Sequence, residues 1–330
     1  MASIHHPSRR RAMRLLAGVL LATAAWAAQA DIFPSRPIKF VVPYPPGGAS
    51  DVTARLIADK LGPMLGQPVI VDNRPGANGI VALEAVSKSP ADGYTILMGN
   101  VGPNAINAGL YPKLPYDPLK SFAPIMLTTT VPLVLLVNPA SGITTTQQLV
   151  AQAKASPGNV KFASGGLGSA THLTAELFKD KAGIDIVHVP YKGDMPAMID
   201  VMGGHVNFTF ATAIAAAPFI AQGRVRVLAT ASRARPKSLA QYPTVAEAGL
   251  ADFESTSWGG VLAPAGTPQP VIALLHDRLA KVMELPDLRE KLEKMGVEVV
   301  GSTPEQFAGY LRSEIVKWTT VIKAAGVTAE

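Results

Sequence analysis

The chain contains no cysteine among its 330 residues. This absence excludes disulfides and thiolate metal sites, and it excludes a lipid anchor on a new N-terminal cysteine after export. Histidine is scarce too. Beyond the first thirty residues it occurs at His172, His188, His205 and His276, at no spacing typical of a metal site. We therefore expect no bound metal.

The sequence also lacks the common motifs of nucleotide binding and hydrolysis. There is no P-loop lysine motif, and Ser50, Ser164 and Ser169 do not lie in a Gly-x-Ser-x-Gly elbow. Residues 166–171 (GLGSAT) come close to a dinucleotide fingerprint, but Thr171 replaces the third glycine. These gaps argue against a secreted α/β enzyme of hydrolase or transferase type, and we expect no cofactor.

Long apolar runs are missing everywhere except near the N-terminus. Four arginines at positions 9, 10, 11 and 14 precede an apolar stretch at 15–25, and residues 28–30 (AQA) form a cleavage site. This order predicts a signal peptide at 1–30 and a periplasmic mature chain without a lipid anchor. Removing the four arginines lowers the net charge from +6 to about +2, too little to indicate a nucleic acid or membrane partner.

From residue 31 onward, short β-branched runs alternate with amphipathic segments. We expect strands near 38–43, 68–72, 94–98, 132–137, 160–163, 185–189, 206–210, 226–230, 256–262 and 297–300. We expect helices near 49–61, 77–88, 146–155, 170–182, 195–203, 213–222, 268–283, 287–295 and 304–325. This alternation predicts an α/β fold with mostly parallel sheets flanked by helices.

The chain divides at two points. Breaks near 128–131 and 251–255 predict lobe one from 31–130 plus 255–330, lobe two from 131–254, and two crossings that form a hinge. In such sheets a ligand binds at the carboxyl ends of the strands, which places it in the cleft between the lobes.

Two distant segments share one pattern. Residues 38–51 (IKFVVPYPPGGASD) and 160–172 (VKFASGGLGSATH) each place an apolar strand before a glycine-rich loop that enters a helix. The helices that follow, at 53–62 and 174–183, match at Thr, Ala, Leu, Asp, Lys and Gly. A helix N-terminus leaves backbone N–H groups unpaired, so two such ends facing each other would bind a small carboxylate from both sides.

Other interpretations of these loops stay open. The glycines can simply be tight strand-to-helix turns. Asp51 can complement its helix dipole, and His172 can be a packed or capping residue. The acid at Asp194 can cap the helix that follows it as readily as contact a ligand.

Taken in order, the motifs resemble the Bug-type, tricarboxylate-transporter-like, periplasmic solute-binding proteins. The segments that carry the resemblance are 37–48 (PIKFVVPYPPGG) with Asp51, 71–79 (VDNRPGANG), 92–95 (DGYT), 164–169 (SGGLGS) with His172, 188–193 (HVPYKG), and Trp258 with 263–268 (APAGTP). The resemblance covers essentially the whole mature chain. It implies a two-lobed, type II-like periplasmic binding fold, and a receptor rather than an enzyme.

The resemblance also implies a ligand and partners. The ligand would be a small carboxylate, such as a di- or tricarboxylate or an aromatic acid, and the partners would be two membrane subunits of a secondary transporter or a sensor kinase, with the receptor itself a monomer. The implied contact residues are Tyr44, Gly47, Gly48, Ala49, Ser50, Asn100, Ser164, Gly166, Gly168, Ser169, His172, Asp194 and Ala211.

Ala211 is a departure from the resemblance. Many members of the family carry an acid directly after the strand that ends here at Phe210, and this chain has Ala211 instead. A buried ammonium group without an acidic partner is costly, so we expect a ligand without a charged amine. A chaperone-like or adhesion protein is a further alternative, but it would give the two glycine loops no purpose.

Overall fold

The strands build one connected, mixed sheet within the described part of the chain. The computed structural model describes residues 33–329, so the predicted signal peptide at 1–30 lies outside the described residues. The strands are β1 (Ile38–Val42), β2 (Val69–Asn73), β3 (Thr95–Asn100), β4 (Phe122–Val137), β5 (Val160–Ser164), β6 (Ile186–Pro190), β7 (Phe208–Thr212), β8 (Arg226–Thr230), β9 (Thr256–Pro264) and β10 (Glu298–Val299).

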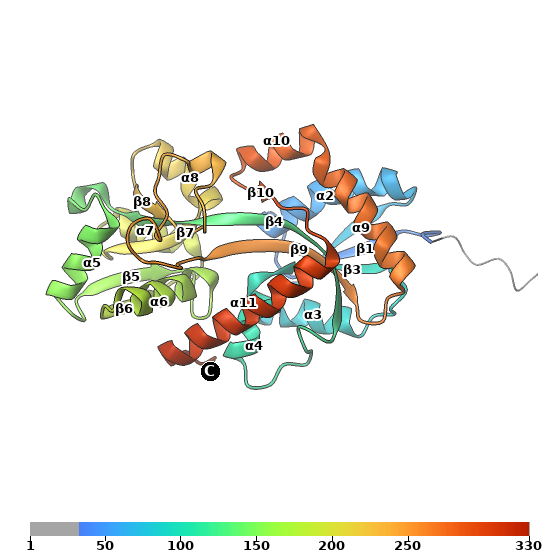
Figure 1. Ribbon diagram of the computed structural model, residues 1–330, viewed down its shortest axis with the longest axis horizontal. Coiled ribbons are helices and arrows are strands. Elements are labelled where there is room, and N and C mark those ends of the chain that lie inside the picture. The colour runs from blue at the N-terminus through green and yellow to red at the C-terminus, as the bar shows by residue number, and fades with distance from the viewer. Residues whose placement is uncertain (1–32, 330) are drawn as a thin grey trace, which may run out of the picture.

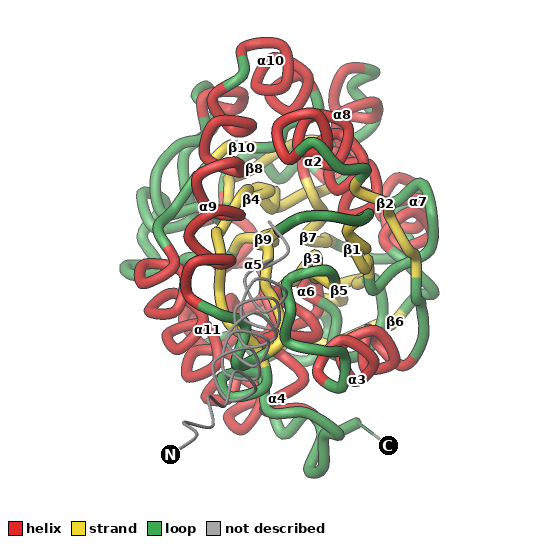
Figure 2. Tube along the Cα trace, turned by 90° about the vertical axis from the view of Figure 1, so that its right-hand side faces the viewer, coloured by secondary structure: helices red, strands yellow, loops and turns green. Residues whose placement is uncertain are grey.

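Helices cover both faces of the sheet, as Figure 2 shows. The α-helices are α2 (Ala49–Leu65), α3 (Ile80–Ser87), α4 (Asn107–Leu110), α5 (Thr146–Ala155), α6 (Ala170–Ala182), α7 (Asp194–Met202), α8 (Ala213–Ala221), α9 (Gln269–Glu284), α10 (Pro286–Lys294) and α11 (Pro304–Ala325). Four short turns of 3-10 or π type are η1 (Ala77–Gly79), η2 (Gly102–Ile106), η3 (Pro139–Ser141) and η4 (Lys237–Leu239). No helix within residues 33–329 is long and apolar enough to cross a membrane.

The sheet runs in the order β2-β1-β3-β9-β4-β7-β5-β6, with β8 and β10 also paired to β4. The expected parallel pairing occurs among β1, β2 and β3 and again among β5, β6 and β7. Every pair that involves β4 or β9 is antiparallel. The predicted α/β fold is therefore confirmed. Its sheet is mixed, because β4 and β9 run antiparallel to their neighbours through its middle.

Strand β4 carries the chain from one half of the molecule to the other. Its first part pairs with β9 from Phe122 to Pro132, and its last part pairs with β7 and β8 from Leu133 to Val137. Figure 1 shows β4 and β9 crossing the centre side by side. Strand β4 runs without interruption through the break expected near 128–131. The β-branched residues there continue the strand, with only register shifts at Pro124/Met126 and Leu127/Thr129.

Alternation along the strands produces two cores. Phe40 and Val42 of β1 pack on one face with α2, α9 and α10, whereas Val41 points to the opposite face. The second core continues from that opposite face, beneath α3 and α11, to Phe162 and Phe208 in the other half. One hydrophobic cluster thus extends through both halves.

Helix α11 adds a third connection between the halves. It packs against α4 and β4 and, further along, against α6 (Figure 1). The buried carboxylate of Glu314 accepts hydrogen bonds from the indole N–H groups of Trp258 and Trp318, each at 3.0 Å, and pairs with Lys317. This contact ties α11 to β9.

Candidate functional site

A cavity of about 670 Å³ opens where several helices begin. Its lining comes from the segments after β1, β5 and β6, from the last residues of β3 and β7, and from one residue of β9. The lining residues are Tyr44, Pro45, Pro46, Gly48, Ala49, Ser50, Asn100, Gly165, Ser169, Ala170, Thr171, Gly193, Asp194, Thr212 and Ser257. The cavity therefore lies at the carboxyl ends of parallel strands in both halves, where the topology predicts a ligand.

The first glycine loop is held by a buried acid. Gly47 has a φ of +87°, which a residue with a side chain rarely adopts, and its N–H donates to Asp51 Oδ2 at 2.8 Å. Asp51 also accepts from Arg55 Nε at 3.1 Å and from Asn73 Nδ2 at 2.9 Å. Burial opposes ionisation of Asp51, but these three donors outweigh it and lower its pKa. Asp51 thus stabilises the conformation of this loop. The first-turn amides of α2 have no side-chain cap.

The second glycine loop satisfies most of its own N–H groups. Gly165 donates to Thr171 Oγ1 at 2.9 Å, Gly166 to Ser164 Oγ at 3.1 Å, and Gly168 to His172 Nδ1 at 3.1 Å. Gly166 and Gly168 are therefore folding residues rather than part of the lining. The start of α6 lines the cavity with its N-cap Ser169 and with Ala170 and Thr171 of the first turn, where backbone amides have no partner within the helix.

Two stacked histidines support this loop from behind. The rings of His172 and His188 lie 3.8 Å apart, and His188 Nε2 hydrogen-bonds Ser164 Oγ at 2.6 Å. Burial and the neighbouring His172 lower the pKa of His188 to about 4. A serine paired with a neutral histidine resembles a nucleophile with its base. However, Ser164 is fully buried and does not line the cavity, so a bound solute cannot reach it.

The third helix start brings an acid into the cavity. Asp194 begins α7 after Gly193, and its Oδ1 accepts from Thr171 Oγ1 at 3.2 Å. Burial raises the pKa of Asp194, and the Thr171 hydrogen bond offsets only part of that effect. A fourth start follows β7, where Thr212 caps α8 by accepting from Ala215 N.

One wall of the cavity is a relay of hydrogen bonds. Tyr44 donates to Asn100 Oδ1 at 3.2 Å, and Asn100 Nδ2 donates to the carbonyl of Trp258 at 2.9 Å. Burial raises the pKa of the Tyr44 phenol, which is therefore neutral and remains a donor. The relay fixes the first loop against β3 and β9.

The electrostatics of the lining favour anions without any cationic side chain. Helices α2, α6, α7 and α8 all start at the cavity, and a helix N-terminus carries about half a positive charge. Among residues 33–329, no lysine, arginine or histidine lines it. Within the same range, no three acidic or histidine side chains are placed to hold a metal ion. The cavity can therefore bind a small anion through backbone amides and hydroxyls.

Comparison with known proteins decides the family. Residues 53–327 match the sequence model described as "Tripartite tricarboxylate transporter family receptor". The chain belongs to the tripartite tricarboxylate transporter receptor family. The expected resemblance is thereby confirmed. The protein BugT of Bordetella pertussis is 40% identical over 318 residues, which cover 95% of this chain and 98% of that one.

Solved structures agree with this receptor in fold. Rhodopseudomonas palustris Rpa4515, solved with adipate, superposes with a TM-score of 0.79 at 36% identity, covering 90% of this chain and 100% of the other. MatC from the same organism, solved with bound malate, gives a TM-score of 0.75 at 31% identity, covering 88% of this chain and 100% of the other. The receptor therefore has the solute-binding fold of this family.

The receptor's cavity brings together about half of the predicted contact residues. Tyr44, Gly48, Ala49, Ser50, Asn100, Ser169 and Asp194 line it, whereas Gly47, Ser164, Gly166, Gly168 and His172 are not among its lining residues. Ala211 is fully buried in β7 and does not face the cavity. Because β7 extends to Thr212, that residue lines the cavity at this strand end instead of Ala211.

Sequence reasoning missed several lining residues. They are Pro45, Pro46, Gly165, Ala170, Thr171, Gly193, Thr212 and Ser257. Most of them are direct neighbours in sequence of residues that were predicted. Ser257 carried no local signal, since it reaches the site through the antiparallel return of β9.

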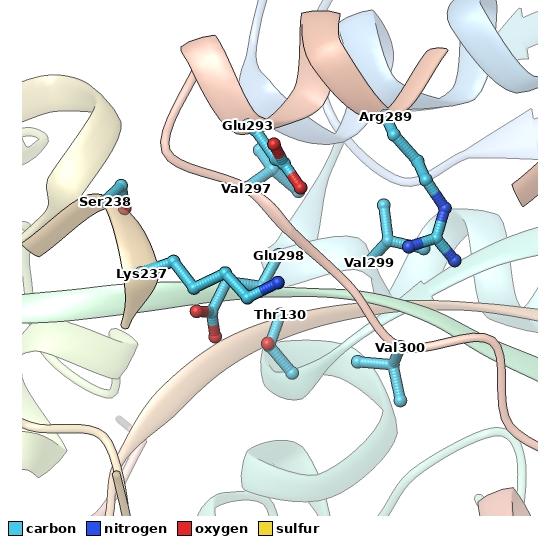
Figure 3. A pocket seen from close by; sticks show the side chains of 9 residues that line it. All are labelled: Thr130, Lys237, Ser238, Arg289, Glu293, Val297, Glu298, Val299 and Val300. Carbon is cyan, nitrogen blue, oxygen red and sulfur yellow. The ribbon is translucent and has the colours of Figure 1, made fainter. Parts of the chain in front are cut away.

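A second cavity of about 480 Å³ lies away from this site, between η4 and α10. Figure 3 shows Lys237 and Ser238 entering it from η4, Arg289 and Glu293 from α10, and Glu298 with Thr130 below. None of the predicted contact residues lines it. Because η4 and α10 belong to different halves, its width depends on how the halves are oriented.

Proposed function

We propose that this chain is a periplasmic receptor that captures a small carboxylate between two lobes and performs no chemistry on it. Lobe one comprises residues 31–130 and 255–330, and lobe two comprises 131–254. The observation that carries the proposal is the cavity where α2 of lobe one faces α6, α7 and α8 of lobe two, without a cationic side chain in the described lining. Backbone dipoles of this kind suit a carboxylate.

A dicarboxylate is the ligand class that we favour. Two related receptors were solved with adipate and with malate, and both are dicarboxylates. The helix starts come from opposite lobes, so each end of such a ligand can meet amides of its own. An aromatic acid or a tricarboxylate remains the next candidate, since Pro45, Pro46, Ala49 and Ala170 give the cavity an apolar surface.

The partners follow from the family. A tripartite transporter receptor delivers its solute to two membrane subunits, and a sensor kinase is the other recipient that we consider. The receptor would act as a monomer that is exported by cleavage after Ala30. The alternative, a secreted hydrolase or transferase, is disfavoured by the inaccessible Ser164.

Isothermal titration calorimetry against a panel of acids tests the proposal. The panel contains adipate, malate, shorter dicarboxylates, citrate, benzoate, glutamate and aspartate. We expect saturable binding of at least one amine-free acid without turnover, followed by recovery of the unchanged acid after denaturation. Absence of binding by every acid, or recovery of a product, would refute the proposed function.

A further inference from the structure

Asp194 is the one charged side chain in the lining of the cavity within residues 33–329. It approaches the second glycine loop so closely that a side chain at Gly165 would meet Asp194 Oδ1 at 2.4 Å. Thr171 is the one described side chain that hydrogen-bonds it. A receptor for anions therefore carries an acid of its own where the ligand enters.

The groups packed around Asp194 supply no counter-charge. The ionisable side chains of the neighbouring elements have partners of their own. Asp51 pairs with Arg55 on α2, and His172 lies near Glu176 on α6. His188 hydrogen-bonds Ser164, and Asp200 of α7 accepts from Tyr191 in the loop before that helix. Lys192 is exposed. From β3, β7 and β9 the cavity receives the neutral Asn100, Thr212 and Ser257.

The hydrogen bonds leave Asp194 in need of a donor. Thr171 has a single hydroxyl proton, and its oxygen also accepts from Gly165 and lies 3.1 Å from Ser169 Oγ. Asp194 therefore obtains at most one donor from this side chain, which satisfies one of its two oxygens. A bound dicarboxylate would displace water from the other oxygen and bring a second negative group beside it. Two carboxylates that share a site do not both stay ionised, and one proton between them removes the conflict.

We propose that Asp194 determines ligand specificity by sharing one proton with a carboxyl group of the bound acid, so that binding takes up a proton from the buffer. This proposal rests on the proposed function. It specifies that the site takes up a carboxylate ligand together with one proton. The proton comes from the buffer acid, which leaves as its conjugate base, and no covalent bond of the ligand changes. A ligand that places no carboxyl group beside Asp194 gains no affinity from it.

The test is calorimetry of the full mature chain with adipate and malate in two buffers of different ionisation enthalpy, repeated between pH 6 and pH 8. The difference in heat between buffers gives the number of protons taken up. We expect about one proton per ligand, and an affinity that falls about tenfold for each unit of rising pH.

Two variants separate the proposal from a general effect of charge. Asp194→Asn keeps the shape of the side chain but does not ionise, so proton uptake should fall to near zero and the affinity should no longer vary with pH. Asp59→Asn removes an exposed acid on the outside of α2 and should behave like the wild type.

The outcomes distinguish this inference from the proposed function. Binding without proton uptake in the wild type overturns the inference alone, as does uptake that persists in Asp194→Asn. Aspartate or glutamate binding more tightly than every amine-free acid, without uptake, also overturns it, because Asp194 would then meet an ammonium group. Failure of every acid to bind overturns both.

Discussion

Replacement of Ser169 by aspartate tests whether the second loop binds an anion. Ser169 is the N-cap of α6, and its hydroxyl accepts from His172 N at 3.2 Å. Aspartate and asparagine cap helices as well as serine does, so both Ser169→Asp and Ser169→Asn should fold. The two variants have nearly the same shape and differ by one negative charge at the cavity.

The magnitude follows from the position of that charge. A carboxylate at residue 169 would lie about 5 Å from a ligand carboxylate at the start of α6. At an effective dielectric of about 20, the repulsion is about 3 kcal/mol, or roughly a hundredfold in Kd. Ser169 is half-exposed, so water screens part of this repulsion, and we expect at least about a tenfold loss relative to Ser169→Asn.

Calorimetry at two salt concentrations measures this loss. The gap between Ser169→Asp and Ser169→Asn should narrow at high salt, because the repulsion is electrostatic. Equal affinities for the two folded variants would show that the loop is only a turn, and the anion-binding argument for α6 would fail.

Three further predictions concern the frame around the cavity. Glu314→Ala leaves the indole N–H groups of Trp258 and Trp318 without their acceptor. It should lower the free energy of unfolding in urea by about 2–5 kcal/mol. A loss below about 1 kcal/mol would contradict the role of this buried carboxylate. Asp51→Asn should lower the free energy of unfolding by about 2 kcal/mol at pH 7. Because the folded pKa of Asp51 is depressed, that cost should shrink as the pH falls below its ordinary value of 3.8, and a cost that grows in acid would reverse our assignment. Spin labels at Ser238→Cys and Glu293→Cys, specific because the chain has no native cysteine, should report a change in distance on ligand binding; an unchanged distance at saturation would argue against closure.

The glycine loops were predictable because their signal is local. A strand, a glycine pair and a helix start within about fifteen residues leave few other conformations, and 38–51 and 160–172 fold as expected. The strand end at β7 was harder. Successive side chains of a strand face opposite sides, so an error of one residue moved the expected contact from Thr212 to the buried Ala211.

Features that depend on distant pairing were beyond the sequence. The first part of β4 contains Pro124 and a run of threonines, and its partner β9 lies more than a hundred residues away. Nothing near Glu314 in sequence indicates that it binds Trp258, which lies 56 residues away. The course of α11 across both halves likewise results from packing rather than from a local motif.

The use of helix starts in place of cations has a consequence for how the receptor responds to its ligand. A lysine attracts an anion over a Debye length of about 8–10 Å, so it would hold the ligand whether the lobes are open or closed. The field of a helix N-terminus falls off within its first turn. Here α2 belongs to lobe one, and α6, α7 and α8 belong to lobe two. A ligand obtains full compensation of its charge only when both sets reach it, which couples occupancy to closure. Asp194 sharpens this coupling, because its negative charge opposes a partly bound anion until a proton is shared.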